Sequence, residues 1–512
     1  MTRLLPSVMK EARALFPLLL ASVIATGARA VVGAGVFHGT VASLGLLGYV
    51  FGSLALGAHS IGHEYSCRTL GILLAQPSDR RRLWLTKLGV VAAMLLMLNA
   101  AMWMWSVPRN DADFNRAWSG YGPELLFLSA LFVAPWLTML CRSSLAGIVF
   151  TGSLFWLLWG ASAVFFIVKD GVNSRIGVNS LTLAVWTMFG VCAFAAIAAW
   201  RRFMRLEAIE GRGADLRLPR WLRGGTEGAS RAQTVSSRRQ SPVWMLVKKE
   251  LHLQQMTLVI AALYVLCWAT AALMDRFVPD FPVDFPLLPL TIMYFALLSI
   301  VIGSLASAEE RQLGTLEWQV LLPMPIWRQW MVKVAVVIGL ALALGVALPI
   351  ALSYIHVSED VRVQGTPLWT DKVFVVRMTA AIVLLTACGL YLSSLSTAAV
   401  QALVLSIPVA FAGAAILPYV ADWAPSMAYK VVTHLGRRPN LIRISPNMYY
   451  RFWSSDIPLA IAAGLAVLLL RFAMQNHRSA ERSLSRLSRQ AIGIVAYLAA
   501  GTVALTAFEI LF

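Results

Sequence analysis

Apolar residues along this chain occur in long, nearly uninterrupted runs that are separated by shorter polar segments. A run of about 20 apolar residues is long enough for a helix to cross the roughly 30 Å hydrocarbon core of a bilayer. A membrane β-barrel would instead alternate apolar and polar residues over segments of about ten positions. The pattern therefore predicts an all-α polytopic membrane protein.

The apolar runs fall into two groups of six, one on each side of a long polar stretch. The expected spans of the first group are 17–37, 40–61, 84–105, 124–141, 146–168 and 181–200. Those of the second group are 256–274, 286–307, 330–353, 373–394, 398–419 and 456–475. A further run at 491–512 follows, so we expect twelve or thirteen transmembrane helices.

The polar stretch at 201–241 separates the two groups. It is rich in Arg, Gly and Ser and has almost no apolar periodicity, which is typical of a flexible linker. The expected organisation is a six-helix half at 1–200, this basic linker, a second six-helix half at 242–475, and a basic segment with an extra helix at 476–512.

A charged segment recurs between the second and third expected helices of each half. Its positions are Glu64, Thr69, Leu70, Pro77, Arg82, Trp84 and Lys87 in the first half, and Glu310, Thr315, Leu316, Pro323, Arg328, Trp330 and Lys333 in the second. The halves also begin alike, since a Lys-Glu pair precedes the first span of each, at 10–11 and at 249–250. We expect 3–15 and 243–255 to be short amphipathic helices at the membrane interface.

Composition agrees with a membrane protein, because 59% of residues are hydrophobic and 13% are charged, and mean hydropathy is +0.71. The net charge of +18 comes from Arg and Lys in the expected loops. Cytoplasmic loops retain such charge, so we expect a cytoplasmic N-terminus and both repeated segments in the cytoplasm. The loop at 420–455 is an exception, since it is basic but falls on the expected external side.

These scattered charges favour anionic lipid as a partner over nucleic acid. The expected location is the bacterial inner membrane or the plasma membrane. The five cysteines, Cys67, Cys141, Cys192, Cys267 and Cys388, lie in apolar runs or at expected cytoplasmic positions, so we expect free thiols.

The repeated segment resembles that of ABC-2-type ABC transporter permeases. In that family a Glu ends the second helix, a Gly-Thr-Leu-Glu stretch follows, and a Pro and basic residues lead to a Lys at the third helix. The second copy has each of these parts, at Glu310, Gly314, Thr315, Leu316, Glu317, Pro323, Arg328 and Lys333. The first copy departs from the pattern, with Arg68 and Gly71 in place of the Gly and the second Glu.

The resemblance implies a permease in which both segments are coupling helices that dock into separate ATPase subunits. The chain has no G-x-x-x-x-G-K-[ST] loop to bind phosphates. We therefore expect no catalytic residue or cofactor in this chain, with ATP and Mg²⁺ bound by two partner ATPases. We expect an exporter or flippase, and the sequence identifies neither the substrate nor the direction of transport.

Two other functions remain open. A twelve-helix secondary transporter of the major facilitator type also has two six-helix halves, but its usual Gly-x-x-x-Asp-Arg-x-Gly-Arg-Arg motif is missing from the sequence. A membrane-embedded lipid-linked transferase would need a polar catalytic cluster, and the sequence contains only the two repeated loops. Few ionisable residues fall within the spans, which is unfavourable for proton-driven transport.

Simpler interpretations apply to single residues of the repeated segment. Trp84, Trp330, Lys87 and Lys333 are residue types that anchor helices at the membrane interface. We favour coupling for Glu64 and Glu310, because they recur together with Thr-Leu and Pro.

His59 and His63 are spaced one helical turn apart, as two metal ligands would be. Their second-half counterparts are Leu305 and Glu309, and no third ligand is evident nearby in the sequence. We expect no metal site.

Overall fold

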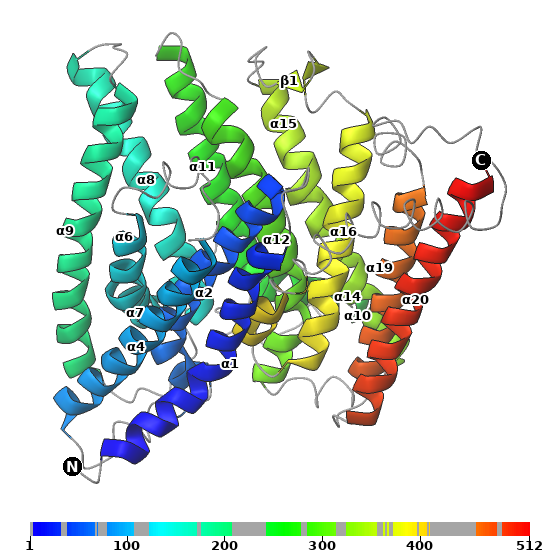
Figure 1. Cartoon of the computed structure of the whole chain (residues 1–512), viewed down its shortest axis with the longest axis horizontal. Helices are drawn as coiled ribbons and strands as arrows, with labels where there is room; N and C mark the ends of the chain where they lie inside the picture. The colour runs from blue at the N-terminus through cyan, green and yellow to red at the C-terminus, as the bar shows by residue number, and fades with distance from the viewer. Residues whose placement is uncertain are drawn as a thin grey trace, which may run out of the picture.

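We describe a computed structural model of the whole chain. The structure describes residues 4–31, 38–66, 69, 79–106, 122–170, 176–206, 242–277, 284–313, 324–355, 362–363, 366–367, 372–396, 399–406, 409, 457–478 and 484–511. Nearly all of them are helical, and the helices lie side by side, with α9 at one edge of the view in Figure 1 and α19 and α20 at the other. The N-terminus and the C-terminus lie toward opposite ends of these helices.

The helices of the first half, in chain order, are α1 (Leu4–Val31), α2 (His38–Ser66), α4 (Arg80–Ser106), α6 (Gly122–Leu128), the π-helix η1 (Ser129–Val133), α7 (Ala134–Cys141), α8 (Ser144–Asp170) and α9 (Ile176–Met204). Then come α10 (Pro242–Leu253), α11 (Gln255–Phe277), α12 (Asp284–Leu313), α14 (Ile326–Leu342), the π-helix η2 (Ala343–Ala347) and α15 (Leu348–Ile355). The two-residue strands β1 (Arg362–Val363) and β2 (Thr366–Pro367) pair antiparallel. The last helices are α16 (Lys372–Leu395), α19 (Ile457–Arg478) and α20 (Leu484–Leu511), and residues 399–406 are also helical.

Eight helices in the described part of the chain are long and apolar enough to cross a membrane. They are Arg80–Met104, Gly122–Cys141, Ser144–Ser162, Leu181–Met204, Gln255–Ala272, Ile326–Tyr354, Phe374–Leu395 and Leu459–Arg478. Large apolar side chains such as Trp186, Ile197 and Val467 are exposed on them, which suits contact with lipid. The prediction of a multi-pass α-helical membrane protein is confirmed, while the organisation into two six-helix halves stays a prediction.

The expected interface helix at 3–15 is not separate. It is the first part of α1, which continues through Pro17 to Val31. The prediction of a separate interface helix is wrong here: the helix runs from Leu4 to Val31 without a break, and Glu11 is buried against α4 instead of facing lipid headgroups. In the second half, α10 is a short helix of its own, and its exposed Trp244 and Met245 suit the membrane interface.

Two of the transmembrane helices contain a π-helical turn, which the sequence did not predict. Such a turn leaves backbone carbonyls without their regular partner within the helix, so other groups must bond to them. In η2 the hydroxyl of Tyr294 donates to the Leu344 carbonyl at 2.8 Å. Tyr294 also stacks on Tyr264, with ring centroids 3.9 Å apart. This polar contact within the apolar core fixes α12 against the bend of the α14–α15 helix.

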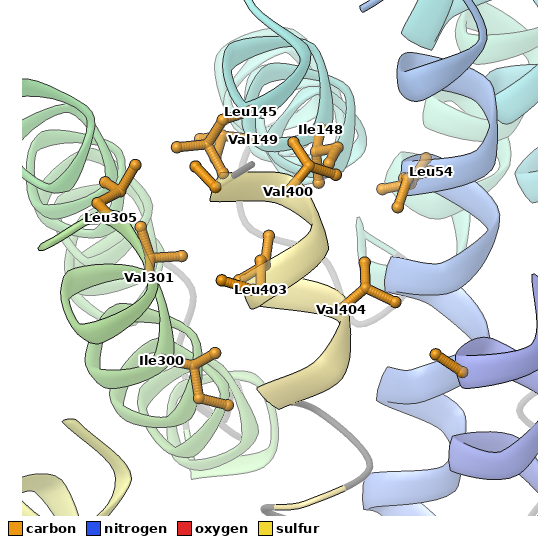
Figure 2. Close-up of a cluster of buried hydrophobic side chains, with 14 of the residues drawn as sticks. Leu54, Leu145, Ile148, Val149, Ile300, Val301, Leu305, Val400, Leu403 and Val404 are labelled. Atoms are coloured by element: carbon orange, nitrogen blue, oxygen red, sulfur yellow. The ribbon is translucent and has the colours of Figure 1, made fainter. Parts of the chain in front are cut away.

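A continuous apolar core joins the two halves of the chain. Figure 2 shows Val400, Leu403 and Val404 of the 399–406 helix between α12 on one side and α2 and α8 on the other. Leu54 of α2 and Ile148 of α8 face this helix from the first half, and both are almost completely buried. Four cysteines, Cys141, Cys192, Cys267 and Cys388, are free thiols, as predicted; Cys67 lies outside the described residues.

Close approach of helix backbones depends on glycine. A Cβ on Gly57 of α2 would overlap the carbonyl of Ala130 in η1. A Cβ on Gly303 of α12 would lie 2.5 Å from the Thr386 carbonyl oxygen and 2.9 Å from the Gly389 Cα of α16. Small residues at such crossings let membrane helices pack by van der Waals contact between backbones.

We predict that Gly303→Ala destabilises the protein by about 1–3 kcal/mol, because the added methyl group forces α12 and α16 apart. Gly339→Ala is the matched control, since a Cβ there meets nothing within 4 Å and alanine favours the helix. The measurement is thermal unfolding of each purified variant in detergent. Equal unfolding temperatures for the two variants would contradict the close crossing.

Candidate functional site

Lys87 of α4 is the centre of a buried ion cluster that joins three helices. Its Nζ lies 2.8 Å from both carboxylate oxygens of Glu11 on α1, and 3.3 Å from Oε1 of Glu64 on α2. It also donates to the Ser60 carbonyl of α2 at 3.1 Å. The side chains of Lys87 and Glu64 are only 4% and 3% exposed. One ammonium group therefore connects α1, α2 and α4.

Lys333 of α14 is the centre of a second cluster with the same parts. Its Nζ bonds to Oε2 of Glu310 on α12 and donates to the Ala306 carbonyl at 2.8 Å. Glu250 of α10 approaches with Oε1 at 3.7 Å. Lys249 of α10 completes the cluster, with its Nζ 2.6 Å from Oε1 of Glu310. Here one ammonium group connects α10, α12 and α14.

The two clusters correspond residue by residue. Glu64 and Lys87 occupy the places of Glu310 and Lys333, which the sequence repeat predicted. The structure adds Glu11 and its counterpart Glu250, neither of which was among the candidate residues. The Lys-Glu pair before the first span of each half was their only sequence signal. The carbonyls of Ser60 and Ala306 complete the correspondence.

The pairing differs between the clusters. Lys87 makes its two shortest ion-pair contacts with Glu11 of the N-terminal helix. In the second cluster both lysines bond to Glu310, while Oε2 of Glu250 has no hydrogen-bond partner. Burial raises the pKa of Glu250 to about 7; the nearby Glu310 carboxylate adds to the rise, and Lys333 and Lys249 oppose it. The charge of Glu250 is thus the most weakly compensated of these four carboxylates.

Thr69 connects the first cluster to the segment that follows α2. Its hydroxyl donates to Oε2 of Glu64, and its backbone N–H donates to the Glu64 carbonyl at 3.0 Å. Thr69 therefore supplies a hydrogen bond to a carbonyl in the last turn of α2, where backbone carbonyls have no partner within the helix. The same carboxylate thus contacts both the buried lysine and the first part of the repeated loop.

The remaining candidate residues divide into three groups. Arg82 and Arg328 are exposed on the first turns of α4 and α14. Trp84 and Trp330 are buried, 2% and 3% exposed. The candidates Leu70, Pro77, Gly314, Thr315, Leu316, Glu317 and Pro323 lie outside the described residues.

The burial of the tryptophans and lysines corrects one interpretation of the repeat. Trp84 packs on Phe203 with ring centroids 4.8 Å apart, and Trp330 packs on His477 at 5.3 Å. Residues that anchor a helix at the membrane interface extend toward lipid headgroups. Trp84, Trp330, Lys87 and Lys333 face other helices instead, so interface anchoring does not explain them.

The rings of His59 and His63 have centroids 5.3 Å apart. Among the described residues, no group of three or more His, Cys, Asp or Glu side chains could hold a metal ion.

The two ion clusters are arranged for charge pairing between helices, since each carboxylate oxygen with a short contact faces a lysine or a threonine.

We predict that Glu11→Gln destabilises the protein by roughly 1–3 kcal/mol, because it leaves a buried ammonium without its two closest charged acceptors. The equivalent change Glu250→Gln is expected to cost less than about 1 kcal/mol, since Glu250 makes only longer ion-pair contacts. Thermal unfolding of both variants in the same detergent measures the difference. A larger drop in unfolding temperature for Glu250→Gln would contradict the conclusion that Glu11 is the more strongly paired of the two carboxylates.

We also predict a pH dependence that comes from Glu250, which lies on α10 outside the candidate spans. Its pKa in the folded protein, about 7, exceeds the ordinary value of 4.5, so the folded state binds more protons than the unfolded state between these values. Stability should fall as pH rises through this window, and Glu250→Gln should remove that part of the dependence. Unfolding temperatures from pH 5 to pH 8, as a rough range around these values, test it; identical profiles would contradict it.

Comparisons of the chain with known protein families, with curated protein sequences and with solved structures find no match.

Proposed function

We propose that this chain is the transmembrane permease of an ATP-driven ABC-2-type transporter, an exporter in which two like halves are fused. Separate ATPase subunits, two per chain, bind and hydrolyse ATP with Mg²⁺. The segments between α2 and α4 and between α12 and α14 are their docking elements. In this proposal the N-terminus and both segments are cytoplasmic, as the distribution of basic residues favours.

The observation that carries the proposal is the pair of equivalent ion clusters directly beside the repeated segments. Each cluster contains the last turns of the helix that enters the segment and the first turns of the helix that leaves it. Each also contains a carboxylate from the helix that begins its half. Such a duplicated arrangement suits a protein with one docking partner on each half.

The clusters make each group of three helices move together. Separating a buried ion pair leaves an uncompensated charge, at a cost of roughly 3–5 kcal/mol. A displacement of the loop between Glu64 and Lys87 is therefore transmitted to α1, α2 and α4 as one body. The same holds for α10, α12 and α14 around Lys333. ATPase closure, applied to both loops, would move the two three-helix groups relative to each other and alternate access to a path between the halves.

The contact between the halves is suited to such movement. Within the described residues it consists largely of apolar side chains, including Leu54, Ile148, Val301 and Val404. Apolar contacts are not directional, so a shift of one helix across them costs less free energy than a shift that separates an ion pair. Directional bonds hold each three-helix group, and non-directional packing lies between the groups.

We predict that Glu310→Ala lowers the ATP hydrolysis rate of the purified transporter several-fold, because Lys333 and Lys249 lose the carboxylate that joins α14 and α10 to α12. Lys249→Ala, which removes the contact between α10 and Glu310, should act in the same direction. The matched control is Lys248→Ala, because Lys248 is the exposed neighbour of Lys249 on the same helix. The measurement is ATPase activity of the full-length tagged chain isolated with its native partner from membranes.

Membrane insertion and the amount of copurified ATPase serve as controls for folding and docking. Because Glu310 is buried, the variants should retain the ATPase subunit and lose its stimulation. Normal hydrolysis by Glu310→Ala would refute the coupling role. An active transporter isolated without any ATPase subunit would instead favour a secondary transporter.

A further inference from the structure

A cavity lined by arginines lies among α2, α7 and α9, and Lys87, Glu11 and Glu64 are not among the residues that line it. Its volume is about 530 Å³. Four arginines contribute to its wall, Arg142 after the end of α7 and Arg201, Arg202 and Arg205 at the end of α9. Trp136 and Phe194 also line it, and they lie farther from the C-terminal ends of α7 and α9 than the arginines do. One part of the cavity is therefore strongly basic and the other part is aromatic.

No acidic side chain is among the described residues that line this cavity. Among the described residues, no carboxylate forms a salt bridge with any of the four arginines. Four arginines that line one cavity repel one another, and a bound anion would relieve the repulsion. The planar guanidinium group matches phosphate with paired hydrogen bonds. The basic part of the cavity thus has the chemistry of a phosphate site.

The backbone at Arg142 supports a role for its side chain. Arg142 ends α7 with φ 52° and ψ 28°, and it is the only non-glycine residue with positive φ in the described part of the chain. Glycine is the usual residue at this position after a helix, because any side chain there costs about 1 kcal/mol or more. Here the position holds an arginine whose side chain lines the cavity.

The apolar part of the cavity continues along one face of α9. Phe194, Ala198 and Arg202 follow each other at helical spacing, so the same face changes from aromatic to basic at the helix end. Phe194 is 60% exposed and packs edge-to-face on Trp136, with centroids 5.5 Å apart. An inorganic phosphate would use only the arginines. An amphiphile would use both parts.

The corresponding place in the second half is closed by protein. Trp330 packs on His477 of α19 as Trp84 packs on Phe203 of α9, so His477 corresponds to Phe203. The residue before each of them then also corresponds, which pairs Asn476 with Arg202. The Asn476 side chain bonds to Ser394 of α16 and to Gln490 of α20, with its Oδ1 accepting from Gln490 at 3.0 Å. The helix α20 therefore covers this site in the second half.

We propose that the arginine cavity binds an anionic phospholipid, with its phosphate on Arg142, Arg201, Arg202 and Arg205 and an acyl chain along Phe194. The lipid takes the place in the first half that α20 takes in the second. The occupant has net negative charge, because the described lining of the cavity offers four arginines and no carboxylate. It has a long apolar chain, because the aromatic part of the cavity is open at Phe194.

The experiment is thermal unfolding of the full-length protein in detergent with phosphatidylglycerol, with phosphatidylcholine or with inorganic phosphate added. A ligand that binds the folded state raises the unfolding temperature. We expect phosphatidylglycerol to raise it, and the other two to have little effect. The double variant Arg202→Gln/Arg205→Gln should need about tenfold more phosphatidylglycerol for the same shift, since it loses charged hydrogen bonds to the phosphate.

The matched control is Arg81→Gln/Arg82→Gln, which removes two exposed arginines from the start of α4 and should leave the lipid response unchanged. Phe194→Ala should weaken the response to long-chain phosphatidylglycerol. It should lower the unfolding temperature without lipid only slightly, because Phe194 is 60% exposed and loses its edge-to-face contact with Trp136. An equal response to both phospholipids, or a response in which the double variant matches the control, would overturn the proposal. A shift produced by inorganic phosphate alone would replace the lipid with a soluble anion.

Discussion

The burial of a lysine among three helices is the constraint on which the arrangement of each half depends. An ammonium group removed from water must be surrounded by acceptors, or its burial costs several kcal/mol. Lys87 finds them on α1 and α2, and Lys333 finds them on α10 and α12. The N-terminal helix of each half is thereby fixed to the helix pair that borders the repeated loop, although Glu11 and Lys87 lie far apart in the sequence.

Two kinds of contact divide the structure mechanically. Ion pairs and backbone carbonyls hold helices within each three-helix group, and glycine lets α12 and α16 approach until backbone touches backbone. Between the halves, aliphatic side chains of α2, α8, α12 and the 399–406 helix interdigitate. Directional contacts specify one geometry, whereas apolar contacts accept several. This difference is the physical basis of our proposal that the two groups move relative to each other.

The two halves are alike at their centres and different at their edges. Both clusters contain a central lysine, two carboxylates and a backbone carbonyl, with a second lysine from the N-terminal helix, Lys10 at 3.9 Å from Glu64 in the first and Lys249 in the second. The shortest contacts of the central lysine go to Glu11 of the N-terminal helix in the first half, whereas both lysines bond to Glu310 in the second. At the outer edge, α20 packs on α19 through Gln490, and the equivalent edge of α9 bears arginines around an open cavity. The two halves therefore share the central charge pairing and differ at this outer edge.

The sequence by itself determined the helical membrane architecture and the importance of Glu64, Lys87 and their repeats. Both follow from local properties, since bilayer thickness sets the length of apolar runs and a repeated polar pattern needs no knowledge of its partners. The structure alone decided that Glu11 and Glu250 complete the clusters, that Trp84 and Trp330 are buried, and that three helix ends form an arginine cavity. A helix that is apolar on every side does not reveal which face meets another helix and which meets lipid. Which face is buried depends on side chains from distant parts of the chain, and it is known only once these side chains are packed in three dimensions.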